Sequence, residues 1–151
     1  MSRISFLPQE RPESCVPACL RMVLATLGVT ISESELYLCS QTDIDGTLPS
    51  LAAQCAESFG FVASSVRLPD LPALLHQIND GYFYPIVFVN LGPLLGLNLL
   101  HAVVIETIDT HSGVVHVIDP AYPSTGRRAW SQALFETGWR MARGQAILIR
   151  S

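Results

Sequence analysis

The chain of 151 residues contains no lysine, and all nine of its basic residues are arginines. Charged residues make up only 15% of the sequence, the formal net charge is -4, and the arginines form no long basic run. A protein that follows a phosphate backbone needs such a run, so the composition argues against nucleic acid as a partner. Without lysine, the Gly-x-x-x-x-Gly-Lys motif of an ATP-binding loop is also excluded.

The sequence lacks the segments that bring a chain to a membrane. Residues 1–13 hold no apolar stretch of the kind found in a secretory signal. The apolar segment from Leu91 to Leu100 is too short for a bilayer and is broken by two glycines, a proline and an asparagine. We therefore expect no membrane span and a cytoplasmic location.

The four cysteines all fall in the N-terminal part of the chain, at positions 15, 19, 39 and 55. They form no Cys-x-x-Cys pair, and no histidine lies at ligand spacing from them, which argues against a zinc site. No other metal or cofactor is indicated. Apolar neighbours are typical of reduced core thiols, and this is the prediction for Cys19, Cys39 and Cys55.

The apolar fraction of 49% is enough to fill one core, and the length predicts a single domain over residues 1–151. Hydrophobic spacing and start signals predict three helices in the first sixty residues. They run from Cys15 to Leu27, from a capping box at Ser32 and Glu35 to about Cys39, and from Pro49 to Phe59 with Thr47 as the cap.

From Phe61 onward the pattern changes to β-branched and apolar runs. The predicted strands are Phe61 to Leu68, Pro85 to Asn90, His101 to Ile108, Val114 to Asp119 and Gln145 to Arg150, with helices at Leu71 to Asn79, capped by Asp70, and at Trp130 to Trp139. Helices followed by a largely antiparallel sheet indicate an α+β fold. We expect a helical lobe over about residues 1–60 and a sheet lobe over about 61–151.

Cys15 stands at the predicted start of the first helix, where unpaired backbone N–H groups and the positive end of the helix dipole favour a thiolate. Gln9 lies six residues earlier, and Pro12 lets the intervening segment turn back. The Gln9 amide and the Cys15 backbone N–H could then bind the oxyanion of a tetrahedral intermediate.

The hairpin that joins the third and fourth predicted strands brings a histidine and a carboxylate together. With the turn centred on Thr110 or His111, His101 lies opposite Asp119 or a neighbour, and the two side chains share a face. A carboxylate beside an imidazole fixes its tautomer and stabilises its cation. Together with Cys15, the pair predicts a thiol nucleophile with a general base and an orienting acid.

Each of these residues also has a purely structural interpretation. Cys15 could be a core cysteine of a helix, His101 a histidine at a strand edge, and Asp119-Pro120 the start of a turn. The remaining histidines are predicted to lie outside the site: His76, His111 and His116.

Several short motifs resemble a known family when they are taken in order. They are Gln9 six residues before Cys15, Ala18-Cys19-Leu20, His101-Ala102-Val103-Val104 opening a strand, and Asp119-Pro120-Ala121 closing the next. This order resembles the papain-like cysteine peptidases that process bacteriocin leader peptides at double-glycine sites.

The resemblance implies a papain-like, two-lobed fold that hydrolyses a peptide bond through a thioester on Cys15. His101 would be the general base and acid, Asp119 the orienting residue and Gln9 the oxyanion donor. Val16-Pro17 follows Cys15 where the transporter-fused members usually carry glycine, so the chain is more similar to free-standing members. Cleavage after a glycine pair in a leader or tail is one expectation for its peptide or protein substrate.

Two alternatives keep the same fold. The domain could bind a leader peptide or partner protein without cutting it, or it could pass the acyl group to an amine or thiol as a transferase. The segment from Leu91 to Leu100 runs straight into His101 and is either buried or a docking surface for a substrate or partner protein.

Overall fold

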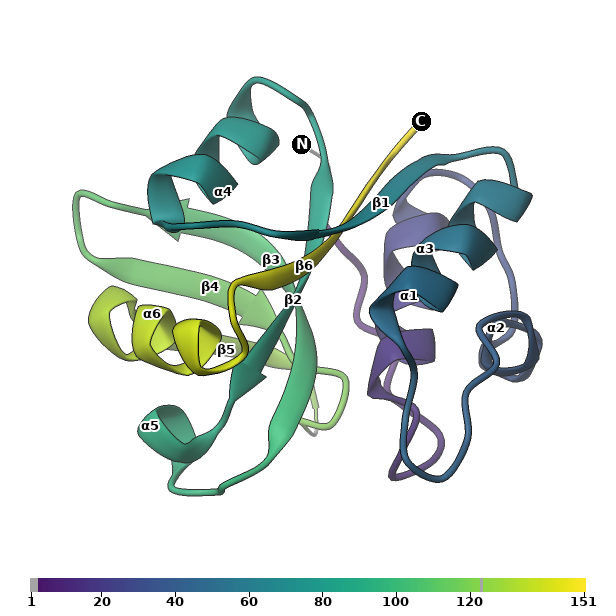
Figure 1. Ribbon diagram of the computed structural model, residues 1–151, viewed down its shortest axis with the longest axis horizontal. Coiled ribbons are helices and arrows are strands. Elements are labelled where there is room, and N and C mark those ends of the chain that lie inside the picture. Colours follow the sequence, from purple (N-terminus) through teal and green to yellow (C-terminus); the bar gives the residue numbers. More distant parts are fainter. Residues whose placement is uncertain (1–2, 123) are drawn as a thin grey trace.

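The structure is a computed structural model that describes residues 3–122 and 124–151 (Figure 1). Residues 1, 2 and 123 of the predicted domain lie outside the described residues. A six-stranded sheet in the order β1-β6-β2-β3-β4-β5 forms its centre, and neighbouring strands in it are antiparallel. The predicted α+β class, with N-terminal helices packed on an antiparallel sheet, is confirmed.

The bounds of most elements agree with the sequence pattern to within a few residues. The helices are α1 (Cys15–Thr26), α2 (Glu33–Cys39), α3 (Pro49–Ser58), α4 (Leu71–Asn79), α5 (Gly92–Leu95) and α6 (Gln132–Met141). The strands are β1 (Val62–Arg67), β2 (Tyr84–Asn90), β3 (Leu100–Asp109), β4 (Val114–Ile118), β5 (Arg127–Ser131) and β6 (Gln145–Arg150).

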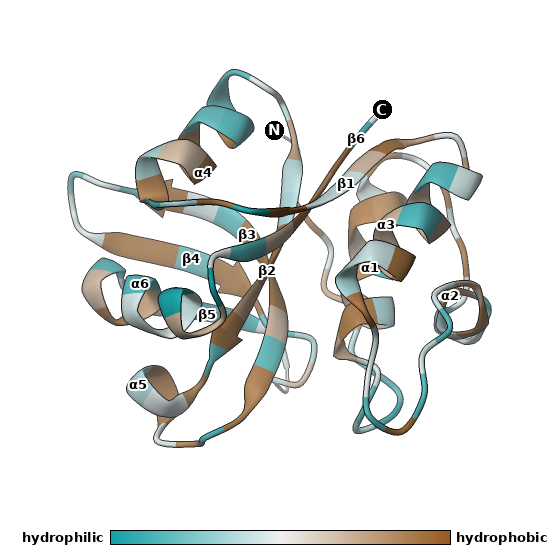
Figure 2. Cartoon of the chain, in the orientation of Figure 1, coloured by the Kyte–Doolittle hydropathy of each residue, from teal (hydrophilic) through white to brown (hydrophobic). Residues whose placement is uncertain are grey.

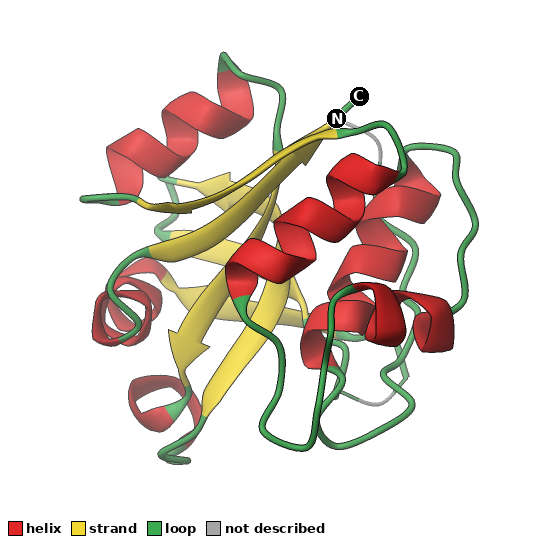
Figure 3. Cartoon of the chain, turned by 45° about the vertical axis from the view of Figure 1, so that its right-hand side comes forward, coloured by secondary structure: helices red, strands yellow, loops and turns green. Residues whose placement is uncertain are grey.

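The sheet separates two hydrophobic clusters, because successive side chains of its central strands point to opposite faces. In β3, Ala102 and Val104 join the cluster formed with α1, α2 and α3, whereas Val103 and Ile105 join the cluster formed with α4 and α6. Figure 3 shows α1, α2 and α3 gathered on one side of the sheet. Hydrophobic residues colour much of β2 and β6 brown in Figure 2, as expected for strands covered on both faces.

Short-range start signals explain where two of the helices begin. Ser32 accepts a hydrogen bond from the Glu35 N–H at 3.1 Å, and Asp70 accepts one from the Ala73 N–H at 2.9 Å. The predicted cap at Thr47 is wrong. Leu48 takes the N-cap position of α3 without a side-chain bond, and the Thr47 hydroxyl pairs with the Thr42 hydroxyl at 2.7 Å instead.

Two elements were not expected from the sequence. The segment Arg127–Ser131 forms the edge strand β5, which pairs with β4, so the last helix begins at Gln132 rather than at Trp130. The segment that precedes β3 contains the short helix α5. Neither has a clear local signal, since β5 begins with two arginines and α5 is only four residues long.

The prediction of reduced core thiols is wrong for two of the three cysteines. Cys39, at the end of α2, forms a disulfide with Cys55 of α3. Apolar neighbours suit a half-cystine as well as a free thiol, so the local pattern could not reveal the pair. Cys19 is a free and fully buried thiol, as expected.

No helix in the described ranges is long and apolar enough to cross a bilayer. Disulfides are rare in the cytosol of most organisms, so the cytoplasmic location stays a prediction.

Candidate active site

Cys15 is the first residue of α1 and is only partly buried. The residue before it, Ser14, is the N-cap and is fully buried. Its hydroxyl accepts from the Arg11 N–H and donates to the Arg11 carbonyl, both at 3.0 Å. Pro17 falls in the first turn, where its missing N–H leaves no gap in the helix. The first turn of α1 therefore presents the Cys15 thiol on a fixed backbone.

His101 and Asp119 lie in contact at one end of the sheet. His101 is the second residue of β3, and Asp119 immediately follows β4. The Nε2 atom of His101 is 2.6 Å from Oδ1 of Asp119, and the two residues are only 7% and 2% exposed. The predicted pairing of these two side chains is therefore present in the structure.

A bulge in β3 brings the two side chains to the same face. Near the turn, Thr107 pairs with His116. If this register extended along the whole hairpin, His101 and Asp119 would lie on opposite faces. The register shifts between Ile105 and Thr107, and beyond the shift it is Ile105↔Val117. The shift restores the shared face. The turn is centred between residues and not, as the sequence predicts, on one, so the shared face comes from the bulge and not from the turn.

The surroundings of His101 favour its charged form. Burial by itself lowers the pKa of the imidazole, but hydrogen bonds to Asp119 and to the Cys15 side chain, with the charges of both groups, outweigh it and raise the pKa to about 9. Because Nε2 faces Asp119, the nitrogen left for Cys15 is Nδ1. Both the Cys15 side chain and the Asp119 carboxylate thus act on the His101 imidazole.

Asp119 is held by more partners than the sequence revealed. Burial raises the pKa of its carboxyl, but the hydrogen bond and charge of His101, with bonds from the Ala121 N–H and Arg128, bring the pKa below its usual value. The Arg128 Nε donates to Oδ2 at 2.9 Å, and its guanidinium lies 3.8 Å from the centre of the Tyr122 ring. No local signal marks Arg128, because its role depends on the unpredicted strand β5.

The segment that carries Gln9 packs against the residue that follows Asp119. The Gln9 backbone N–H donates to the Pro120 carbonyl at 2.9 Å. The Gln9 side chain lies over its own loop, where Nε2 donates to the Arg11 carbonyl at 2.8 Å and to the Pro12 carbonyl at 3.3 Å. The segment turns back as the sequence predicted, and the action of Gln9 on an oxyanion remains a prediction.

The model of the Peptidase C39 family matches residues 3–150 of this chain. The chain belongs to the Peptidase C39 family. A protein of Methanothermobacter thermautotrophicus described as uncharacterized is 34% identical over 113 residues, which are 75% of this chain and 69% of that protein.

Solved C39 structures share the fold over nearly the whole chain. The peptidase domain of Streptococcus ComA, a bi-functional ABC transporter involved in a quorum-sensing pathway, is 26% identical, with a TM-score of 0.78 over 97% of this chain and 98% of that one. A double-glycine-motif protease from an AMS/PCAT transporter, solved with its leader peptide, is 19% identical, with a TM-score of 0.76 over 97% and 91%. A putative C39-like peptidase from Bacillus anthracis is 15% identical, with a TM-score of 0.78 over 100% and 98%.

Two pockets of this C39 chain are lined in part by sequence neighbours of His101 and Asp119. One, of about 830 Å³, is lined by the loop that precedes α3, by the turn that precedes β6 and by Leu100, the neighbour of His101. The other, of about 530 Å³, is lined by Gln9, Pro120 and Tyr122, among others. Cys15 and His101 themselves line neither pocket, but sequence neighbours of the site line both.

Cys19, the other free thiol, is fully buried in the core. Burial raises the pKa of Cys19 well above its usual value, and its Sγ donates to the Ala102 carbonyl at 3.6 Å. Within residues 3–122 and 124–151, no three His, Cys, Asp or Glu side chains are grouped as a metal site requires.

Proposed function

We propose that this C39 chain is a cysteine peptidase with Cys15 as nucleophile, His101 as general base and acid, and Asp119 as the orienting residue. The observation that carries the proposal is the bridging position of His101. Its Nε2 lies 2.6 Å from Oδ1 of Asp119, and the Cys15 side chain acts together with Asp119 to raise its pKa. An imidazole held in this way can take a thiol proton and keep it close to the reacting bond.

The first half of the reaction makes a thioester. His101 takes the proton of the Cys15 thiol, and the sulfur attacks the carbonyl carbon of the peptide bond. The negative oxygen of the tetrahedral intermediate accepts hydrogen bonds from the Cys15 backbone N–H and from the Gln9 amide. The C–N bond then breaks, and the imidazolium gives its proton to the leaving amine.

Water completes the cycle. His101 removes a proton from the water, the hydroxide attacks the thioester carbonyl, and the C–S bond breaks. The sulfur takes the proton back from His101, and the product leaves as a carboxylic acid. An acyl transferase would differ only here, since an amine or thiol would replace the water.

The substrate that fits best is a peptide with an apolar side chain near the cleavage point. Leu97, Leu99 and Leu100 are 53%, 55% and 58% exposed, and Leu100 lines the larger pocket next to His101. Such an exposed patch beside a reactive group suits peptide binding. Leader peptides with a glycine pair are the first candidates, because relatives of the same fold include a double-glycine-motif protease.

The test is hydrolysis of synthetic leader peptides that place a Gly-Gly pair before the scissile bond. We expect the native chain to release two fragments whose masses sum to that of the peptide plus one water. Cys15→Ala should abolish the release, while the matched control Cys19→Ala should retain it. Cleavage by Cys15→Ala, or no cleavage of any Gly-Gly peptide by the native chain, overturns the proposal.

One observation favours the non-cleaving alternative. The Gln9 amide donates to the Arg11 and Pro12 carbonyls, so it must turn away from its own loop to reach an oxyanion. If it stays there, the site binds a peptide and stabilises the intermediate poorly. A stable complex with an intact peptide, and no fragments after long incubation, identifies this function.

A further inference from the structure

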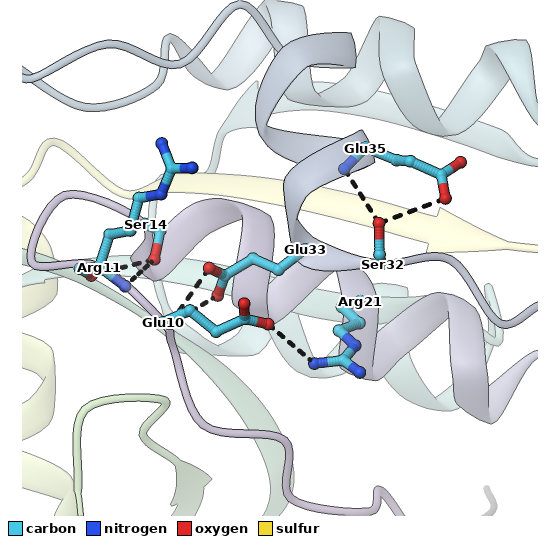
Figure 4. A network of polar contacts seen from close by, with 7 residues as sticks. All are labelled: Glu10, Arg11, Ser14, Arg21, Ser32, Glu33 and Glu35. Carbon is cyan, nitrogen blue, oxygen red and sulfur yellow. Dashed lines mark hydrogen bonds and ion pairs between the residues drawn. The ribbon is translucent and has the colours of Figure 1, made fainter.

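Glu33 is a buried carboxylate that the proposed mechanism does not use. It is the first residue of α2 and is only 2% exposed. Both of its oxygens accept from the Glu10 backbone N–H, at 3.0 and 3.1 Å (Figure 4). Glu10 belongs to the loop that leads from Gln9 to Cys15, so α2 reaches across to this loop through Glu33.

Three consecutive backbone N–H groups of the loop are bound by three different parts of the chain. The Gln9 N–H donates to the Pro120 carbonyl, the Glu10 N–H to Glu33 and the Arg11 N–H to the Ser14 hydroxyl. Pro120 follows Asp119 in the chain, and Ser14 precedes Cys15. The loop that carries the oxyanion donor is therefore bound to the sequence neighbours of Asp119 and of Cys15. Between these two contacts it is bound to Glu33.

Charged and polar groups surround the Glu33 carboxylate on several elements. Burial raises the pKa of Glu33, while the hydrogen bond from the Glu10 N–H and the polar Ser14 side chain oppose that effect. The Glu10 carboxylate adds repulsion and the Arg21 guanidinium adds attraction, and these two side chains form an ion pair at 3.4 Å. Figure 4 shows Glu35, on the same helix turn, bound instead to Ser32 and away from the loop.

The raised pKa of Glu33 indicates how the residue affects the stability of the fold. A carboxyl group whose pKa is raised by folding favours the folded state less when it is ionised than when it is protonated. The fold is therefore less stable with Glu33 ionised than with Glu33 protonated. Residues that lower stability in this way are typical of functional sites.

We propose that Glu33 is a positioning residue that fixes the Gln9 loop for oxyanion binding by accepting the Glu10 N–H. The inference rests on the proposed peptidase function. Glu33 acts only through the loop, so its loss displaces the oxyanion donor while the thiol, the imidazole and the pocket of about 830 Å³, which the loop does not line, remain in place. The turnover rate should fall, whereas substrate binding and the reactivity of the thiol should not.

The test compares Glu33→Gln, which keeps a neutral acceptor, Glu33→Ala, which removes the acceptor, and the control Glu35→Gln. Three quantities are measured on each full chain: kcat and KM on a Gly-Gly peptide, the alkylation rate of Cys15 by iodoacetamide, and hydrogen exchange of the Glu10 amide. Alkylation displaces iodide directly and forms no oxyanion, so it reports the thiol alone. Amide exchange reports the contact between Glu33 and the loop without any need for catalysis.

We expect kcat to fall by about 10- to 100-fold in Glu33→Ala and by less in Glu33→Gln, with KM and the alkylation rate changed by less than about twofold. The Glu10 amide should exchange faster in the same order, and Glu35→Gln should match the native chain in every measurement. Unchanged exchange in Glu33→Ala overturns the contact itself. Faster exchange with unchanged kcat, or an equal loss of kcat and alkylation, overturns the positioning role.

The two proposals fail in distinguishable ways. A native chain that cleaves no peptide, but whose Glu10 exchange still depends on Glu33, refutes the peptidase function and with it the catalytic role of Glu33. If Glu33→Ala does not fold, Glu33→Gln carries the test, since it keeps the shape of the side chain.

Discussion

Arg128 donates its Nε to Oδ2 of Asp119 at 2.9 Å, while Oδ1 of the same carboxylate lies 2.6 Å from His101. The carboxylate is thus held at both oxygens, and the Ala121 N–H adds a third contact at 2.9 Å. Because the carboxylate orients the imidazole, the guanidinium determines indirectly where the His101 ring lies.

Removal of Arg128 should therefore lower turnover more than stability. We expect Arg128→Gln to reduce kcat by about tenfold, because a freed carboxylate no longer holds the imidazole at one angle. The matched control is Arg127→Gln on the same strand, which removes contacts with Glu106 and with the Ile4 carbonyl but none with Asp119. Equal losses of kcat in the two variants would show that Arg128 only stabilises the edge strand.

The pH dependence of catalysis should reveal the raised pKa of His101. The imidazolium protonates the leaving amine, so kcat/KM should fall as the pH rises through about 9. Asp119→Asn should lower kcat by at least about 100-fold and move this alkaline limb to lower pH, because the Asp119 charge and hydrogen bond raise the pKa. A limb that stays in place in the variant contradicts the proposed role of Asp119.

His101 should also make the stability of the fold depend on pH. Its pKa is raised on folding from 6.5 to about 9, so its stabilising contribution is fully present below pH 6.5 and is lost as the pH rises through about 9. We expect the difference in unfolding free energy between the native chain and His101→Gln to shrink over this interval. Denaturant unfolding at pH 6, 7.5 and 9.5 measures it, and a difference that grows with pH is the opposite result.

Much of the fold could be predicted because its signals are local. Ser32 and Asp70 lie next to the helices that they cap, and the apolar runs of β2 and β3 are visible in the sequence itself. The bulge beyond Ile105 and the strand β5 could not be predicted, because both depend on pairing with β4.

The candidate site divides in the same way. Cys15, His101 and Asp119 could be proposed from the sequence because each stands at the end of a predicted element. Arg128 and Glu33 were missed as site residues because their partners are 9 and 23 positions away in the chain and no local motif links them. The Cys39–Cys55 disulfide is likewise a contact between two helices.

That disulfide should stabilise the helical part without supporting the chemistry. It closes a loop with a sequence separation of 16, for which chain entropy predicts about 3 kcal/mol of unfolding free energy. Cys39→Ser with Cys55→Ser should lose stability of that order, and a mild reductant should produce the same loss in the native chain. At temperatures below its melting temperature, the double variant should turn over substrate as fast as the native chain. An unchanged free energy of unfolding in the double variant contradicts the presence of the disulfide.

The central claim is a thioester between the substrate and Cys15, and it can be observed directly. A Gly-Gly peptide is mixed with the native chain, quenched in acid within the first turnover, and the intact protein and its proteolytic fragments are weighed. We predict a mass increase equal to the mass of the N-terminal cleavage product less one water. The added mass should lie on the fragment that contains Cys15. Product formation without this adduct, or an adduct at another residue, contradicts the claim.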